Sequence, residues 1–261
     1  MNIGIVGCGY IGSALAKFFE CEHTVFKYDK NIEGLSDVSR KDGINACDLV
    51  FVCVGTPDSP SGCDLSAVFE VFLWLDAPAC IKSTVLPGTT NVVRGVRSVY
   101  ARTAFSPEFM GESEDHIWNS PGSCGFVIVA GDDEACDLVD RAYREVEASL
   151  KFFRASEPQV AEMCKYMVNC WLATKVAFVN QFFDLAAERR MDFSELRRLW
   201  LLDPRVGESH TIVTEERGFG GHCLPKDLHA IVAANSGSVE LLEAVMSYNN
   251  WLAAARQVER A

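Results

Sequence analysis

The sequence has 261 residues, with 24 Lys and Arg against 36 Asp and Glu, so its formal net charge is −12. A composition of 49% hydrophobic and 23% charged residues is that of a soluble globular chain and excludes a disordered, collagen-like or small disulfide-stabilised protein. The acidity and the absence of Lys/Arg runs argue against binding to nucleic acid or to an anionic membrane surface. No apolar run approaches the roughly 18 residues that a membrane-spanning helix needs.

The cysteines indicate a reducing compartment. There are eleven of them, an odd number, and no C-x-x-C pair occurs, so neither a disulfide framework nor a metal site is expected. The N-terminus lacks the basic region of a signal peptide. We therefore expect a cytoplasmic protein.

The first part of the chain alternates apolar segments of strand length with helical periodicity. This alternation predicts an α/β domain over residues 1–155, a Rossmann-like, doubly wound parallel sheet with crossover helices. Leu49–Val54 is apolar at every position, as expected of a strand covered on both faces. The predicted strands are Ile3–Val6, Thr24–Tyr28, Leu49–Val54, Cys80–Thr84, Thr103–Phe105, Phe126–Ala130 and Lys151–Arg154.

The pattern changes after Arg154 and predicts a helical domain over residues 156–261. Ser156 is the expected N-cap of a helix of unusual length that runs to about Arg190. A second helix opens at Asp192, and a final amphipathic helix covers Ser238–Glu259. Both long helices should bury apolar faces that so short a chain cannot cover alone, so we expect a homodimer.

A glycine-rich turn follows the first predicted strand and predicts a dinucleotide site. Glycines at these positions permit a tight turn and a close approach of the backbone to a pyrophosphate at a helix N-terminus. Asp29 ends the next strand and favours NAD over NADP, because a carboxylate repels a 2′-phosphate. A glycine turn needed only for helix packing is the alternative. The motif residues are Gly7, Cys8, Gly9, Tyr10, Ile11 and Gly12.

The segment Gly218–Asp227 contains three glycines, a proline and Cys223. A cysteine where a loop becomes a helix gains thiolate character from the N-terminal amides of that helix. Asp227 lies four residues later, and if the segment is helical there, both side chains lie on one face. A buried cysteine in a tight turn is the alternative.

Further polar residues occupy positions where ligands bind in such folds. Lys165 and Asn169 share one face of the long helix, and their alternative is an exposed polar stripe. Thr84 and Glu108 follow predicted strands, where doubly wound sheets bind ligands. Taken alone, Glu108 is better explained as a solvated loop acid.

In combination these motifs resemble the UDP-glucose/GDP-mannose dehydrogenase family, and the resemblance covers the whole chain. The most specific motif is G-F-G-G-H-C-L-P-K-D at residues 218–227. It is supported, in the same order as in the family, by G-C-G-Y-I-G, V-G-T-P, K-S-T-V-L-P-G-T-T, F-S-P-E-F-M, A-E-M-C-K-Y-M-V-N and L-L-E-A-V-M-S-Y-N-N.

The resemblance implies an NAD-dependent enzyme that oxidises a sugar-nucleotide alcohol to a carboxylate in two hydride transfers. Cys223 matches the nucleophile, which forms a thiohemiacetal and then a thioester. Lys165 and Asn169 match the groups that stabilise oxyanions. Asp227 and Thr84 match the pair that holds a water near the substrate alcohol, and Glu108 matches an acid of the hydrolytic half.

The same resemblance assigns binding positions. Thr56, Thr84 and Glu112 match residues that line the cofactor cleft, and Arg205 matches an arginine that reaches the partner subunit's substrate site. The expected substrate-binding residues are Glu108, Lys165, Asn169, Arg205, Phe219, Gly220 and Gly221.

Family members also carry a third, nucleotide-binding domain, so the resemblance implies a short form without that C-terminal domain. Two other functions stay open. One is a two-electron dehydrogenase of the 3-hydroxyacid type, which needs no cysteine. The other is an NAD-binding protein without catalysis.

Overall fold

The computed structural model describes residues 1–60, 62–96, 102–111, 118–235 and 237–259. The chain forms two compact units, one of Met1–Pro57 with Cys63–Lys165 and one of Asp58–Gly62 with Tyr166–Ala261. The division falls inside a long helix, whereas the sequence predicts a domain boundary between residues 155 and 156.

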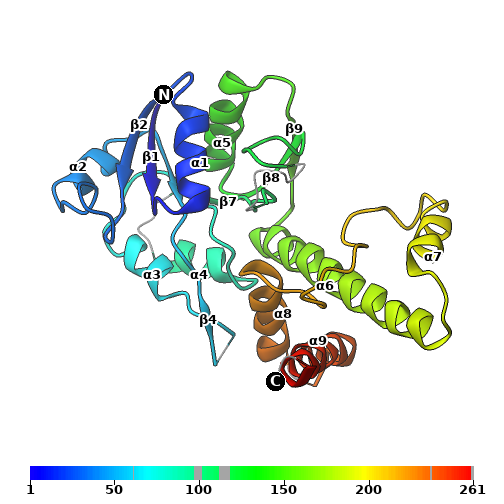
Figure 1. The fold of residues 1–261 in the computed structure, drawn as a ribbon. Coiled ribbons are helices and arrows are strands. Elements are labelled where there is room, and N and C mark those ends of the chain that lie inside the picture. Colours follow the sequence, from blue (N-terminus) through cyan, green and yellow to red (C-terminus); the bar gives the residue numbers. More distant parts are fainter. Residues whose placement is uncertain (61, 97–101, 112–117, 236, 260–261) are drawn as a thin grey trace. The chain divides into compact units, whose positions relative to one another are not determined.

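The first unit is built on one sheet, in which the described residues form seven strands (Figure 1). Their order is β2-β1-β3-β6-β7-β8-β9, and five neighbouring strands, from β2 to β7, are parallel. The α/β class expected from the sequence is therefore confirmed. The strands are β1 (Asn2–Val6), β2 (Thr24–Tyr28), β3 (Leu49–Val52), β6 (Ala79–Ile81), β7 (Thr103–Phe105), β8 (Phe126–Gly131) and β9 (Lys151–Arg154).

Two strands, β8 and β9, run opposite to the other five and depart from the predicted parallel pattern. β8 runs antiparallel to β7, and β9 is again parallel to β8. A parallel neighbour requires a crossover connection, usually a helix, from one end of the sheet to the other. The described part of the segment between β7 and β8 contains no helix, so the chain turns back at the edge where β7 ends.

Helices cover both faces of the sheet. Leu49 and Phe51 of β3 face the core formed with α1 and α5, whereas Val50 and Val52 face the core formed with α2, α3 and α4. β3 is buried at every residue, which confirms the expectation of a strand covered on both faces. The helices are α1 (Tyr10–Phe19), α2 (Arg40–Asn45), α3 (Ser66–Phe72), α4 (Thr89–Val96) and α5 (Asp133–Val146).

The second unit is helical, apart from a short hairpin segment. The helices predicted along it are all present, and the side chain of Asp192 caps α7 by accepting hydrogen bonds from the backbone N–H groups of Ser194 and Glu195. The hairpin lies against α8, where Asp58 Oδ1 is 2.5 Å from His229 Nδ1. The elements are β4 (Asp58–Ser59), β5 (Gly62–Cys63), α6 (Pro158–Glu188), α7 (Phe193–Trp200), α8 (Cys223–Ala234) and α9 (Glu240–Glu259). In the described residues no helix is both long and apolar enough to cross a membrane.

The beginning of α6 belongs to the first unit, and a buried carboxylate holds it there. Glu162 is fully buried. Its Oε2 accepts from the backbone N–H of Gly88 at 2.5 Å, and its Oε1 accepts from the N–H and the hydroxyl of Thr90 at 2.9 and 2.6 Å. The carboxylate thus satisfies N–H groups at the start of α4 that have no partner within that helix.

Replacing Glu162 with Ala is expected to lower the free energy of unfolding by about 3 kcal/mol, because buried N–H donors of α4 lose their acceptor. Urea unfolding followed by circular dichroism measures this change. Glu188→Ala is the matched control, since Glu188 is an exposed residue of the same helix, and it should change stability by less than about 0.5 kcal/mol. Equal midpoints for the two variants would contradict the anchoring role.

Candidate functional site

The glycine-rich turn between β1 and α1 has the geometry of an anion site. A Cβ atom at Gly12 would lie 1.9 Å from the carbonyl oxygen of Gly7, whereas a Cβ at Gly9 would meet nothing within 4 Å. Helix α1 begins at Tyr10, and in the described structure no side chain caps it at Gly9. The backbone at Gly9 is therefore open to close approach at the N-terminus of α1, as a pyrophosphate site requires.

Asp29 lies directly after β2 and beside this turn. Its Oδ2 accepts from the backbone N–H of Cys8 at 2.7 Å, and its Oδ1 accepts from the N–H of Asn31 at 2.8 Å. A carboxylate has about four acceptor positions, so these bonds orient it and leave capacity for ribose hydroxyls. The residues present therefore fit a dinucleotide without a 2′-phosphate.

Thr56 and Thr84 meet at the same edge of the sheet. The hydroxyl of Thr56 donates to the carbonyl oxygen of Thr84 at 2.8 Å, joining the segments that follow β3 and β6. Tyr10 donates from its hydroxyl to the carbonyl oxygen of Gly111 at 2.7 Å, and Ile11 packs on the core. Glu112 lies outside the described residues.

Glu108, which follows β7, forms a buried ion pair with Lys82. Lys82 Nζ lies 3.1 Å from Glu108 Oε2, and the two side chains are only 2% and 12% exposed. Glu108 Oε1 also accepts from the N–H groups of Phe109 and Met110 at 2.9 and 3.0 Å. Burial raises the pKa of Glu108, but Lys82 and these amides outweigh burial, and the resulting pKa is below the ordinary value.

The sequence prediction missed the role of Lys82 beside Glu108. The position of Lys82 in K-S-T, at the end of a strand, indicated a polar group at this edge of the sheet. It did not indicate that Glu108, 26 residues later, is the partner of Lys82. Lys165 of α6 also lies in this unit, with Nζ 5.3 Å from the ring centroid of Phe109. The first unit therefore brings Thr84, Glu108 and Lys165 to the segments around the carboxyl ends of its strands.

In the second unit, Cys223 is the first residue of α8 and is exposed. Asp227 lies one helical turn later and is only 1% exposed. Asn169 of α6 donates from Nδ2 to Asp227 Oδ2 at 2.5 Å, and Lys226 pairs with the same carboxylate. The structure thus brings Asn169 and Asp227 into contact. The sequence could not predict this contact, because the two residues are 58 positions apart in the chain.

The other cysteine of this unit has a different environment. Cys170 is buried, and burial, with a smaller effect of the Asp227 carboxylate, raises its pKa to about 12. A thiol with such a pKa stays protonated near neutral pH, and the thiolate is the nucleophilic form. Cys223 is therefore the candidate nucleophile of the second unit.

The loop before Cys223 is held from two helices. Asn249 of α9 accepts from the N–H of Phe219 at 2.7 Å and donates to its carbonyl oxygen at 3.1 Å. Asn180 of α6, which is buried, accepts from Arg217 Nε at 2.8 Å and from the N–H of Gly218 at 3.2 Å. These amide side chains fix the backbone four and five residues ahead of Cys223, and sequence reasoning did not identify them.

Gly220 and Gly221 lie between this held segment and Cys223. A Cβ at either position would meet nothing within 4 Å, and Gly221 has φ of +74°, a conformation that favours glycine. The backbone is therefore open beside the cysteine. Arg205 is apart from these residues in the chain and folds onto Asp203, with Nε 2.9 Å from Oδ1.

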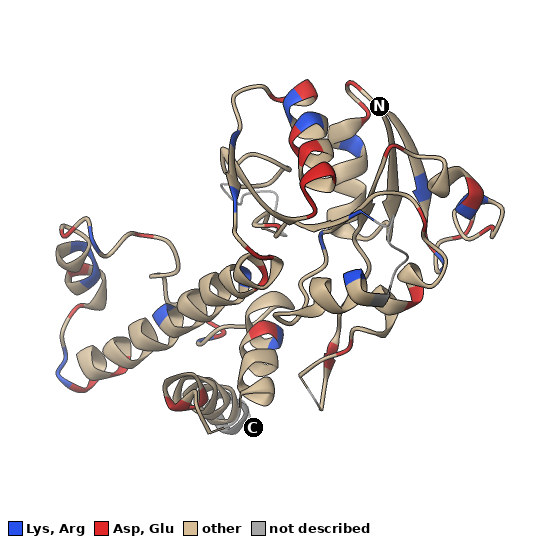
Figure 2. Cartoon of the chain, turned by 180° about the vertical axis from the view of Figure 1, so that it is seen from behind, with Lys and Arg blue, Asp and Glu red and all other residues tan. Residues whose placement is uncertain are grey.

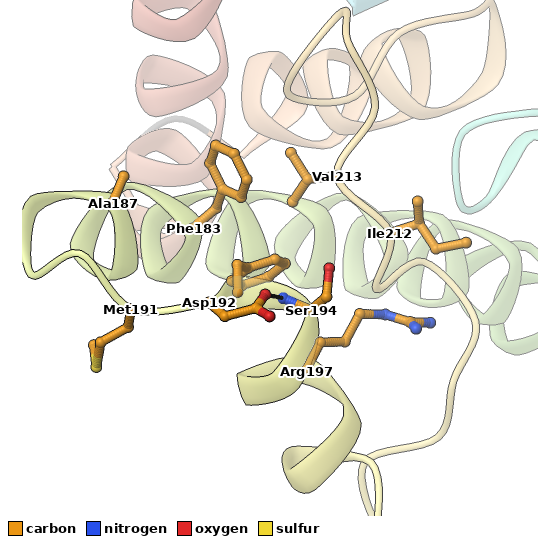
Figure 3. A pocket seen from close by; sticks show the side chains of 9 residues that line it. Phe183, Ala187, Met191, Asp192, Ser194, Arg197, Ile212 and Val213 are labelled. Atoms are coloured by element: carbon orange, nitrogen blue, oxygen red, sulfur yellow. Dashed lines mark hydrogen bonds between the residues drawn. The ribbon is translucent and has the colours of Figure 1, made fainter.

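The second unit also contains a cavity of about 530 Å³ beside α6 and α7 (Figure 3). None of the residues predicted to form the site lines it. Its polar groups are engaged locally, because Asp192 caps α7 and Arg197 donates to the carbonyl oxygen of Thr211 at 3.1 Å. Among the described residues, no three His, Cys, Asp or Glu side chains gather as a metal site would require.

The chain is similar to known dehydrogenases over most of its length. The family profile described as the central domain of the UDP-glucose/GDP-mannose dehydrogenase family matches residues 159–251. A GDP-mannose 6-dehydrogenase of Pseudomonas savastanoi pv. phaseolicola is 33% identical over 303 residues, which cover 95% of this chain and 68% of that protein. The chain spans about two thirds of the length of the curated relatives it matches.

Solved structures show the same fold. A UDP-glucose dehydrogenase of Pyrobaculum islandicum superposes with a TM-score of 0.82 at 25% identity, over 96% of this chain and 68% of that one. The 3-hydroxyisobutyrate dehydrogenase of Mycobacterium tuberculosis has a TM-score of 0.71 at 15% identity, over 100% and 99% of the two chains. The second likeness concerns the fold alone.

The dehydrogenases of this family are oxidoreductases that use NAD, in agreement with the cofactor expected from the glycine turn and Asp29. The match to the pseudomonad enzyme extends over nearly all of this chain. The chain belongs to the UDP-glucose/GDP-mannose dehydrogenase family.

Proposed function

We propose that this protein is an NAD-dependent nucleotide-sugar dehydrogenase that oxidises a primary alcohol of the sugar to a carboxylate. The observation that carries the proposal is the position of Cys223 at the start of α8, one turn before an Asp227 that accepts a hydrogen bond from Asn169. Helix N-terminal amides favour a thiolate. A two-electron dehydrogenase has no need of such a nucleophile.

The cofactor is held by the glycine turn and by polar groups at the sheet edge. The N-terminal amides of α1 bind the pyrophosphate, and Asp29 accepts from ribose hydroxyls. Two NAD molecules, bound one after the other, would each accept one of the two hydrides. The residues proposed to bind it are Gly7, Gly9, Tyr10, Ile11, Gly12, Asp29, Thr56, Thr84 and Glu112.

The residues of the chain remove the proton of the alcohol, bind its carbon covalently and assist hydrolysis. The alcohol loses a proton and a hydride to give an aldehyde, and Asp227 with Thr84 holds the water that takes the proton. The sulfur of Cys223 then bonds to the aldehyde carbon, and loss of a second hydride leaves a thioester. Water attacks the thioester, the C–S bond breaks, and the carboxylate product and free Cys223 result.

Charge that develops on the substrate oxygen needs donors. Lys165 and Asn169, one turn apart on α6, supply an ammonium and an amide N–H for this purpose. Glu108 accepts a proton from the water that hydrolyses the thioester. Phe219, Gly220, Gly221 and Arg205 complete the substrate contacts, the last of them across a subunit interface.

The stoichiometry of reduced cofactor tests the function. With UDP-glucose as substrate, we expect two NADH for each sugar nucleotide consumed, and Cys223→Ser should slow turnover by roughly three orders of magnitude. Absorbance at the NADH band with quantified product measures both. GDP-mannose serves as the second substrate to be screened.

Cys21→Ser is the control, because Cys21 is also exposed and lies outside the site. It should leave the rate unchanged. One NADH for each substrate, with a free aldehyde or ketone, would favour the two-electron alternative. Binding of NAD without turnover on any sugar nucleotide would favour a non-catalytic protein.

We also propose a homodimer, because large aromatic side chains are exposed along one stripe of α6 in the second unit. Trp171, Phe178 and Phe182 are 59%, 47% and 43% exposed, at spacings that place them on one helical face. Figure 2 shows that charged residues are sparse along α6. Exposed apolar stripes of this kind are typical of subunit interfaces.

Light scattering tests the homodimer. The natural protein should have the mass of a dimer, and Trp171→Asp should shift it toward the monomer at the same concentration, because a charge enters the apolar contact. Leu73→Asp is the matched control, since Leu73 is 86% exposed but belongs to the first unit. A natural protein that is monomeric would contradict the proposal.

A further inference from the structure

Glu108 sits in a buried environment with a single cation in direct contact, as far as the described residues show. Lys82 Nζ is 3.1 Å from Oε2, and it also donates to the carbonyl oxygen of Pro107 at 3.2 Å and to the hydroxyl of Ser106 at 3.4 Å. Lys82 therefore holds the segment that leads to Glu108 as well as the carboxylate itself.

The other titratable groups around this pair do not replace Lys82. Burial raises the pKa of Tyr143 and of the neighbouring thiols, so these groups stay neutral near pH 7. Lys165 lies over the ring of Phe109. The neighbouring groups are Tyr143 of α5, Cys53 after β3, Cys80 of β6 and Cys124 before β8.

Burial opposes ionisation of a carboxyl group, so the carboxyl of Glu108 would be protonated more readily if it had no cation beside it. Lys82 reverses that tendency, and its own pKa is raised despite burial because Glu108 stabilises its charge. Each member of the pair thus keeps the other ionised.

We propose that Lys82 is a positioning residue that holds Glu108 ionised and oriented for the hydrolytic half of the reaction. This inference rests on the proposed function. In the described residues, Glu108 accepts from Lys82, Phe109 and Met110, which leaves about one of its four acceptor positions for a water molecule.

The step that Lys82 supports is the attack of water on the thioester. Glu108 takes one proton of the water as its oxygen bonds to the thioester carbon. The C–S bond then breaks, its electron pair stays on sulfur, and the proton on Glu108 passes to that sulfur or to solvent. No redox change occurs, and Lys82 keeps its proton throughout.

A salt bridge that only stabilises the fold would give the same geometry, so the test needs a readout of the ionisation of Glu108. We would measure kcat for NADH formation from UDP-glucose between pH 5.5 and 9 in the natural protein, Lys82→Met and Lys82→Arg. In Lys82→Met the pH at which kcat begins to fall on the acid side should rise by one unit or more. Below that pH, kcat should fall about tenfold for each further pH unit. Lys82→Arg retains the cation and should keep the acid limb of the natural protein.

An acid limb that Lys82→Met leaves in place would overturn the inference, even if kcat fell uniformly. Should Lys82→Met fail to fold, a ¹³C-glutamate titration of the natural protein decides instead, with Glu108→Gln used to assign the signal. The carboxyl of Glu108 should stay ionised to a pH below the ordinary range of glutamate, and protonation near pH 6 or above would overturn the inference. This titration needs no substrate, so its outcome is distinct from failure of the proposed function, which would show as a natural protein that forms no NADH.

Discussion

One uninterrupted helix, α6, supplies buried polar anchors within both units, and candidate site residues of each unit depend on it. Within its first two turns, Glu162 accepts hydrogen bonds from the N–H groups of Gly88 and Thr90. Further along, Asn169 donates to Asp227 of α8, and Asn180 accepts from Arg217 and Gly218. A helix of this length tolerates buried polar side chains because each of them finds a partner on a different element.

The electrostatics of the first unit are local. Residues 1–150 carry 22 acidic and 11 basic side chains, so the overall field repels an anionic nucleotide. The attraction therefore has to come from the amides at the N-terminus of α1 and from individual cations such as Lys165. The pair Lys82–Glu108 follows the same logic, because a buried ammonium, together with two backbone amides, favours the ionised form of a buried carboxyl.

Much of the fold could be predicted from the sequence because local patterns determine it. The all-apolar β3, the long α6 and the Asp192 cap each depend on residues close together in the chain. The apolar pattern of β8 carries no direction, and its antiparallel direction follows instead from a connection to β7 whose described residues contain no helix. The partners of Glu108, Asp227 and Phe219 could not be predicted, because they come from elements 26, 58 and 30 residues away.

The covalent role of Cys223 is the central claim, and mass spectrometry of the protein quenched with acid during turnover tests it most directly. With NAD and UDP-glucose present, the account predicts that the peptide containing Cys223 gains the mass of a sugar-nucleotide acyl group, and that Cys21 does not. Formation of NADH without any adduct on Cys223, at quench times shorter than one turnover, would contradict the account.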